Sequence, residues 1–115
     1  MPGSAFTQRL DLLEDSGQIS ASARAATLRF VAAAEDAFGV AIDEANGAML
    51  VTHLAMAVTR TERGEPLDAA PPAALVDEVA AHQAELAFVR SQLAGLGLPE
   101  SEEIFMAAHV CTLTA

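Results

Sequence analysis

The chain has 115 residues and a mass of 11.9 kDa, close to the commonest size of a protein domain, so we expect one domain over residues 1–115. The formal net charge of -10 opposes direct binding to a nucleic-acid backbone. The six basic residues in that sum are all arginines, and the lack of lysine excludes Schiff-base chemistry and Walker-type phosphate binding.

The composition predicts an all-α fold. Alanine makes up about a quarter of the chain, runs of β-branched residues are scarce, and tyrosine and tryptophan are absent. Apolar residues recur at helical spacing between glycines, prolines and capping residues. This pattern indicates a compact bundle of about five helices.

The first two helices have recognisable limits. The first should cover about residues 4–16, because Gly17 follows as a stop. Its apolar spacing comes from Phe6, Leu10 and Leu13. The second should be capped by Ser20 or Ser22 and end at Gly39, where a residue with positive φ can close the last turn. Its expected apolar stripe is Leu28, Val31 and Phe38.

The third helix should begin at Asp43, a good N-cap, and end before Gly64. The residues expected to share its buried face are Met49, Leu50, His53, Leu54, Ala57 and Val58. The segment from Gly64 to Pro72 contains three prolines, so we expect a rigid connector and not a helix.

Two further helices complete the expected bundle. The fourth is predicted as one long helix that ends at Gly95 and Gly97. Its apolar positions are Leu75, Val79, Leu86, Val89 and Leu93. The fifth should start near Pro99 and Ser101. Its expected buried face is Phe105, Met106, His109 and Leu113.

The three histidines have different surroundings. His82 lies between Glu78 and Glu85 at helical spacing, which predicts a solvated residue with ordinary surface pairings. His53 and His109 instead lie on apolar helix faces. An imidazole in such a place must find a hydrogen-bond partner, line an interface or carry out chemistry.

Two kinds of catalytic site could use these histidines. A metal site could add Glu102 and Cys111, but His109 and Cys111 are two positions apart on a predicted helix and therefore point to nearly opposite sides. A cysteine–histidine nucleophile pair meets the same objection, although Cys111 could reach His53 across helices. The alternative for Cys111 is a small buried apolar residue.

Two segments resemble the signatures of the PTS regulation domain family. In the first signature, the family has a leucine three residues before a histidine, an aliphatic residue directly after the histidine, and an arginine seven residues after the histidine. The matching residues of this chain are Leu50, His53, Leu54 and Arg60. In the second, the matching residues are Glu102, Phe105, His109 and Val110. The order of the signatures and the 56 positions between the histidines also agree with the family. The resemblance covers about residues 18–113.

The chain departs from the family pattern in three respects, one of which is the lack of the asparagine that is common shortly after the first signature helix, where this chain has Asp68. Thr52 stands where the family commonly has an aspartate before the first histidine. Family members usually carry two such domains behind a nucleic-acid-binding module, so this chain resembles the stand-alone, single-domain form.

The resemblance implies a regulatory module and not an enzyme, with no cofactor. Its phosphorylation sites would be His53 and His109, with Arg60 and Glu102 in phosphate-pairing or supporting roles. Arg60 could equally serve as a cation at a helix C-terminus. The implied donor is the histidine-containing phosphocarrier protein or a IIB component of the sugar phosphotransferase system. The phosphorylation state of the histidines would be passed on through altered dimer or partner contacts in antiterminator-like transcription regulation.

Other readings of the chain remain open. It could be a helical homodimer whose histidines fill an interface without phosphorylation, or a small metal- or cysteine-dependent enzyme. In each case we expect a homodimer, because broad alanine-rich helix faces permit close helix packing. One cysteine, no leader pattern and no long apolar run predict a cytoplasmic protein without membrane segments.

The apolar stripes also predict where the histidines lie. The stripes around His53 and His109 should pack together, which would place both imidazoles in one partly enclosed groove within reach of Arg60 and Glu102. Desolvation there would keep the pair mostly neutral at pH 7. His82 should lie apart from both.

Overall fold

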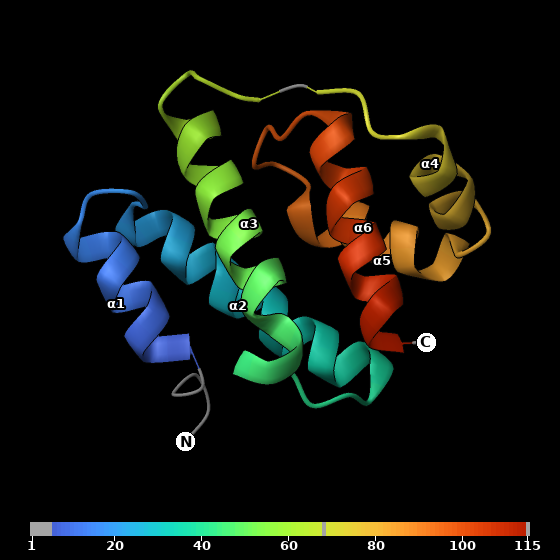
Figure 1. Cartoon of the computed structure of the whole chain (residues 1–115), viewed down its shortest axis with the longest axis horizontal. Helices are drawn as coiled ribbons and strands as arrows, with labels where there is room; N and C mark the ends of the chain where they lie inside the picture. The colour runs from blue at the N-terminus through green and yellow to red at the C-terminus, as the bar shows by residue number, and fades with distance from the viewer. Residues whose placement is uncertain (1–5, 68, 115) are drawn as a thin grey trace.

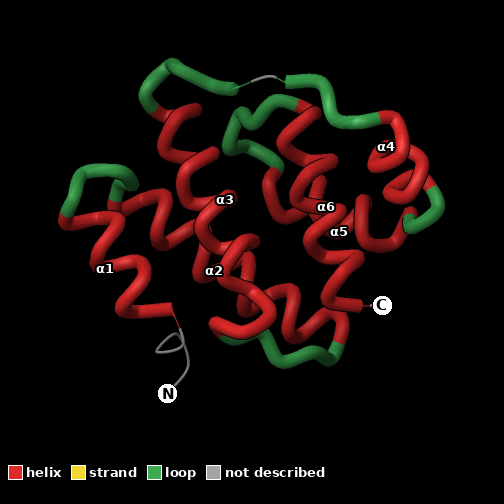
Figure 2. Tube along the Cα trace, in the orientation of Figure 1, coloured by secondary structure: helices red, strands yellow, loops and turns green. Residues whose placement is uncertain are grey.

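Helices are the only regular elements in the described part of the chain, residues 6–67 and 69–114 of a computed structural model (Figures 1 and 2). The six helices are α1 (Thr7–Asp15), α2 (Ala21–Phe38), α3 (Glu44–Glu62), α4 (Ala73–Ala80), α5 (Gln83–Leu93) and α6 (Glu100–Thr114). The all-α prediction is therefore confirmed, with one helix more than the expected number of about five.

The predicted caps define the limits of α2 and α3. The Ser20 hydroxyl accepts a hydrogen bond from the Ala23 backbone N–H at 3.0 Å, and Gly39 ends α2 with φ 63°. The Asp43 carboxylate accepts from two backbone N–H groups at the start of α3, and the Asn46 side chain accepts from the Asp43 N–H at 2.8 Å. This reciprocal capping box fixes the start of the helix that carries His53.

The first helix is slightly shorter than predicted. It begins at Thr7, and Gly17 follows its end with φ 77°. The predicted start near residue 4 lies outside the described residues. Phe6 and Leu10 are buried, and α1 packs against α2.

The prediction of one long fourth helix was wrong. The chain leaves the helix after Ala80 and resumes at Gln83, with His82 at φ -123° and ψ 64°. The Ala81 N–H still donates to the carbonyls of Asp77 and Glu78, so α4 closes normally before the bend. The bend lets α4 and α5 both pack against α6 and bury Val79 and Leu86.

The helix faces differ from the predicted stripes at a few positions. In α2 the deepest aromatic residue is Phe30, which is 2% exposed, whereas Leu28 and Phe38 are only partly buried. In α3 the predicted core residue Met49 is 75% exposed. The actual face of α3 is carried by Leu50, Val51, Leu54, Ala55 and Val58.

The order of packing places α3 in the middle of the molecule. Helix α2 packs on one side of α3 and α6 on another, while α4 and α5 cover α6 (Figure 1). The Cα radius of gyration is 13.4 Å, as expected for a compact chain of this length. Within the described residues, no helix combines the length and the apolar character needed to cross a membrane.

Candidate functional site

The contact between α3 and α6 brings together the two histidines that the sequence singled out. The ring centroids of His53 and His109 are 5.5 Å apart, with the rings edge to face at 81°. Beneath them, buried Leu50 and Leu54 of α3 and Met106 of α6 form part of the core. The prediction that the two imidazoles lie close together is confirmed.

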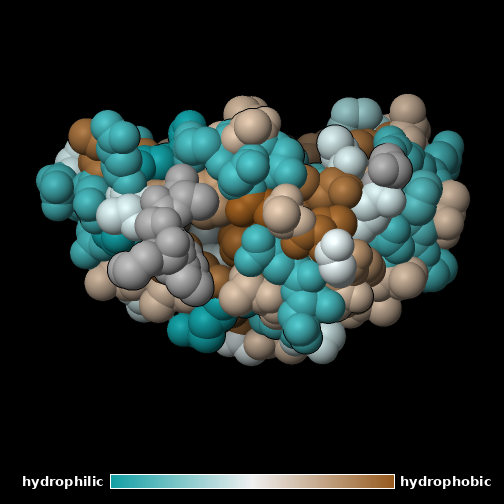
Figure 3. Space-filling view, turned by 90° about the horizontal axis from the view of Figure 1, so that it is seen from below, coloured by the Kyte–Doolittle hydropathy of each residue, from teal (hydrophilic) through white to brown (hydrophobic). Residues whose placement is uncertain are grey.

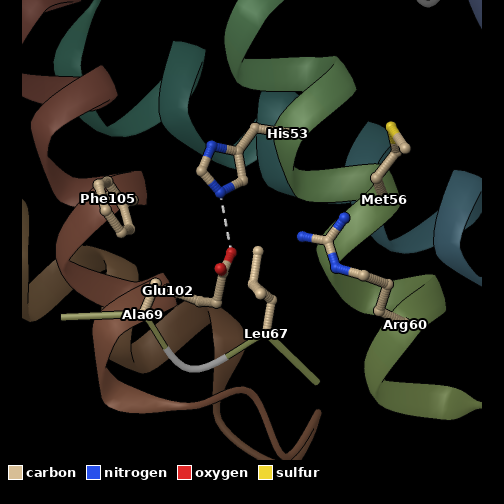
Figure 4. Close-up of a pocket in the computed structure, with 7 residues that line it drawn as sticks. All are labelled: His53, Met56, Arg60, Leu67, Ala69, Glu102 and Phe105. Atoms are coloured by element: carbon tan, nitrogen blue, oxygen red, sulfur yellow. Dashed lines mark hydrogen bonds and ion pairs between the residues drawn. The ribbon is translucent and has the colours of Figure 1, made fainter. Parts of the chain in front are cut away.

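His53 has a specific partner in Glu102. Its Nε2 lies 2.8 Å from Glu102 Oε2, and the side chains are 27% and 5% exposed, respectively (Figure 4). An ionised carboxylate can only accept hydrogen bonds, so Nε2 must carry a proton and Nδ1 of a neutral His53 keeps the lone pair. Glu102 therefore fixes both the orientation and the tautomer of His53.

His109 has a more apolar environment. It is partly buried and has no hydrogen-bond partner among the described residues. Burial, and to a smaller extent the neighbouring His53, lowers the pKa of His109 below its ordinary value of 6.5. The imidazole of His109 is therefore mostly neutral at pH 7, as the sequence predicted for this position.

A pocket of about 270 Å³ opens beside His53. Its lining residues are His53, Met56, Arg60, Leu67, Ala69, Glu102 and Phe105 (Figure 4). Arg60 and Glu102 thus reach the same pocket as His53, as predicted. His109 is not among the lining residues of this pocket: the two rings contact each other, and of the two only His53 lines it.

Arg60 has an unusual place in this pocket. Its Nε is buried and makes no hydrogen bond in the described structure. The end of its side chain points toward the space bounded by Leu67 and Glu102 (Figure 4). Within residues 6–67 and 69–114, the Nε–H group of Arg60 therefore has no acceptor.

His82 belongs to a separate part of the molecule. It is exposed at the bend between α4 and α5, and its Nδ1 lies 2.8 Å from the Glu78 backbone carbonyl. The predicted pairing with the carboxylates of Glu78 and Glu85 was wrong, because Glu85 instead accepts a hydrogen bond from Thr114 at 3.0 Å. The chain bend at His82 removes the helical spacing on which that pairing depended.

The structure gives little support to a catalytic Cys111. Burial above all, with smaller effects from Glu85 and Glu78, raises the pKa of the Cys111 thiol. A thiol in such surroundings is mostly protonated at neutral pH and is a poor nucleophile. In addition, no group of three or more histidine, cysteine, aspartate and glutamate side chains is placed to hold a metal ion within the described residues.

One contact near the site was not found from the sequence. Arg9 of α1 donates to the Thr52 hydroxyl at 3.2 Å and to Glu44 at 2.6 Å. Thr52 directly precedes His53, so α1 braces the turn of α3 that carries the imidazole. A pair 43 positions apart in sequence has no local spacing signal that could have revealed it.

The chain matches no protein-family model, no curated protein and no solved structure. The function of the site must therefore follow from its own residues.

Proposed function

We propose that this domain is a phosphohistidine switch, in which His109 and His53 accept phosphoryl groups from another phosphorylated protein. The observation that carries the proposal is the edge-to-face contact of the two imidazoles at the α3–α6 interface, with Glu102 holding one ring. The resemblance of both histidine segments to the signatures of PTS regulation domains supports the same function and suggests the donor.

The transfer itself needs little from the protein. A lone pair on an imidazole nitrogen attacks the phosphorus of a donor phosphohistidine, the new N–P bond forms as the donor N–P bond breaks, and the donor imidazole leaves with the electron pair. His109 is suited to this step because its lowered pKa keeps a lone pair available at pH 7. The donor would be the histidine-containing phosphocarrier protein or a IIB component.

His53 is suited in a different way. Glu102 holds the Nε2–H group, which orients the ring and stabilises positive charge on it. Arg60 lines the pocket beside the same imidazole, and its Nε has no hydrogen-bond partner among the described residues. Its positive charge can offset through space the negative charge that a phosphoryl group brings to His53. These are the supporting roles that we assign to Glu102 and Arg60.

The output of the switch would be a change of contacts. A phosphoryl group adds roughly two negative charges at an interface packed mainly with apolar residues, and it does so on a chain of net charge -10. Repulsion and desolvation would loosen the packing of α6 against α3. We propose that partner or dimer contacts, in transcription regulation, respond to this change.

A homodimer is part of the proposal. Apolar side chains gather in the middle of the face seen from below, between hydrophilic ends (Figure 3). The exposed large apolar residues of the described chain include Met49 and Leu12, which are 75% and 66% exposed. Such surface is often covered by a second subunit. Light scattering at tens of micromolar tests this point, and a monomer would contradict it.

Intact-mass analysis tests the phosphorylation directly. The full chain is incubated with phosphoenolpyruvate, the phosphotransferase enzyme I and the phosphocarrier protein, and in a second series with IIB components. We expect one or two acid-labile phosphoryl groups, with the gain reduced in His109→Ala and in His53→Ala and unchanged in His82→Ala. His82→Ala is the matched control because His82 is exposed and remote from the pair.

The same experiment identifies the main alternative. A helical interaction protein would need the His53–Glu102 hydrogen bond only to satisfy two polar groups at a packed interface. In that case no donor would add a phosphoryl group, while His53→Ala would still reduce the free energy of unfolding.

A further inference from the structure

We propose that the pocket beside His53 binds a small organic carboxylate, with its carboxylate on Arg60 and a short apolar chain against Met56, Leu67 and Phe105. The proposal goes beyond phosphoryl transfer, since it concerns a reversible ligand of the unmodified chain. It rests on the pocket itself and on the Arg60 side chain that lines it, whose Nε has no hydrogen-bond partner among the described residues.

Arg60 differs from most of the other arginines of the chain in lacking a partner. Arg60 makes no hydrogen bond or ion pair within residues 6–67 and 69–114. Four others are bonded: Arg9 to Glu44, Arg24 to Asp11, Arg63 to the Gly17 carbonyl and Arg90 to Glu100. A buried donor without an acceptor is costly, and a charged donor more so. An anion in the pocket would supply an acceptor for the terminal nitrogens of the same guanidinium and so compensate its charge.

The rest of the pocket selects the kind of anion. Its walls are mainly apolar, and Leu67 reaches over it from the connector between α3 and α4 while remaining 55% exposed (Figure 4). A ligand with an apolar chain would cover this leucine. A bare inorganic ion would leave the Leu67 side chain exposed to water.

The charges favour a monoanion. Arg60 is the only arginine among the described residues that line the pocket, and Glu102 already contributes a carboxyl group that is hydrogen-bonded to His53. A singly charged carboxylate balances one guanidinium and can accept two parallel N–H bonds from it. A doubly charged phosphate would exceed that charge and lie near Glu102. The volume of about 270 Å³ suits a chain of a few carbons.

The probe for this site is butyrate, titrated into the full unphosphorylated chain and followed by NMR. We expect saturable shifts of the Met56 methyl and Arg60 Nε–H signals. Butyrate should bind about tenfold more tightly than acetate, because two more methylene groups are buried. Butylammonium, which has the same chain and the opposite charge, should give no saturable shift.

Variants separate this site from general charge effects. Arg60→Gln should weaken butyrate binding about tenfold or more, and Arg60→Lys should retain part of it. Arg29→Gln removes one positive charge from an exposed position on α2 and should leave binding unchanged. Circular dichroism of each variant verifies that the fold is kept.

Three results would overturn the proposal: no saturable shift with butyrate, equal binding to the wild type and Arg60→Gln, or tighter binding of inorganic phosphate than of butyrate. Since no phosphodonor is present in the titration, its outcome is independent of whether the histidines accept phosphoryl groups.

Discussion

The two sides of α3 use polar residues in opposite ways. On the side of α1 and α2, arginine–carboxylate pairs such as Arg9–Glu44 and Arg24–Asp11 lie at or near the surface. On the side of α6, Glu102 is 5% exposed and pairs with a histidine, and a second histidine contacts the first. The first side is a set of surface links around an apolar core, whereas the second places titratable groups inside the packing.

The difference separates surface pairs that link helices at little energetic consequence from buried groups that the proposed switch would use. Exposed ion pairs contribute little and are screened by salt. A buried carboxylate costs desolvation energy that a well-packed apolar residue would avoid. Such a group is worth keeping where its chemistry is used, which is the expectation for Glu102 and its histidine.

The largest effect is expected at Glu102. Glu102→Ala removes the acceptor of His53 Nε2 and leaves a hole in the first turn of α6, so the free energy of unfolding should fall by about 1–3 kcal/mol. Glu102→Gln keeps the size and one acceptor oxygen and should lose less. Urea unfolding monitored by circular dichroism measures both variants.

Glu103→Ala is the matched control for this variant. Glu103 lies in the same turn, so its removal has a similar effect on the helix dipole, and it reaches only the loose 3.8 Å pairing with Arg90. If Glu102→Ala were no less stable than Glu103→Ala, the buried pair would not be important for the α3–α6 contact.

An intermediate effect is expected from His109 and depends on pH. Because burial lowers the pKa of His109, the unfolded chain binds this proton more tightly than the folded chain. Above the unfolded pKa of 6.5, protonation of His109 does not reduce the free energy of unfolding. As the pH falls from 6.5 toward the lower pKa of the folded state, the free energy of unfolding decreases, and below that pKa it loses no more from this group. His109→Gln should flatten this part of the pH dependence.

Urea unfolding at several values between about pH 7.5 and 5 measures that slope for the wild type, His109→Gln and His82→Gln. His82→Gln should keep the slope of the wild type. An unchanged slope in His109→Gln would show that His109 is solvated like a surface residue.

The smallest effect is expected on the opposite side of α3. Arg24 pairs with Asp11 at 2.6 Å and with Glu14 at 3.2 Å, linking α1 to α2. Arg24→Ala should lower the free energy of unfolding by about 0.2–1 kcal/mol, and by less at high salt. Unfolding at two salt concentrations measures this. A loss as large as that of Glu102→Ala would remove the contrast between the two sides.

Local chemistry explains which parts of the fold the sequence could predict. Ser20, Gly39 and Asp43 act within a few residues of their own position, and each has the predicted role. The bend at His82 has no such signal, because neither glycine nor proline is near it. It follows from packing two short helices on α6, which depends on residues far along the chain.

The site shows the same division. Periodicity placed His53 and His109 on apolar faces, and packing those faces together brought the rings into contact. Periodicity also placed Met49 on the buried face, although it lies 75% exposed, because a pattern of apolar residues alone cannot tell a covered face from an uncovered one. Which of the two imidazoles lines the pocket depends on how α3 and α6 pack together, and no local pattern specifies that.

The distance along the chain between the two halves of the site has a consequence for biosynthesis. His53 and Glu102 are 49 positions apart, so closing this contact requires α4, α5 and the start of α6 to be present. A nascent chain that has emerged only as far as the end of α3 contains His53 but lacks both Glu102, which orients the His53 ring, and His109. The His53–Glu102 contact therefore cannot form until the ribosome has released the first turn of α6, and the His53–His109 contact forms only after the following turns have emerged.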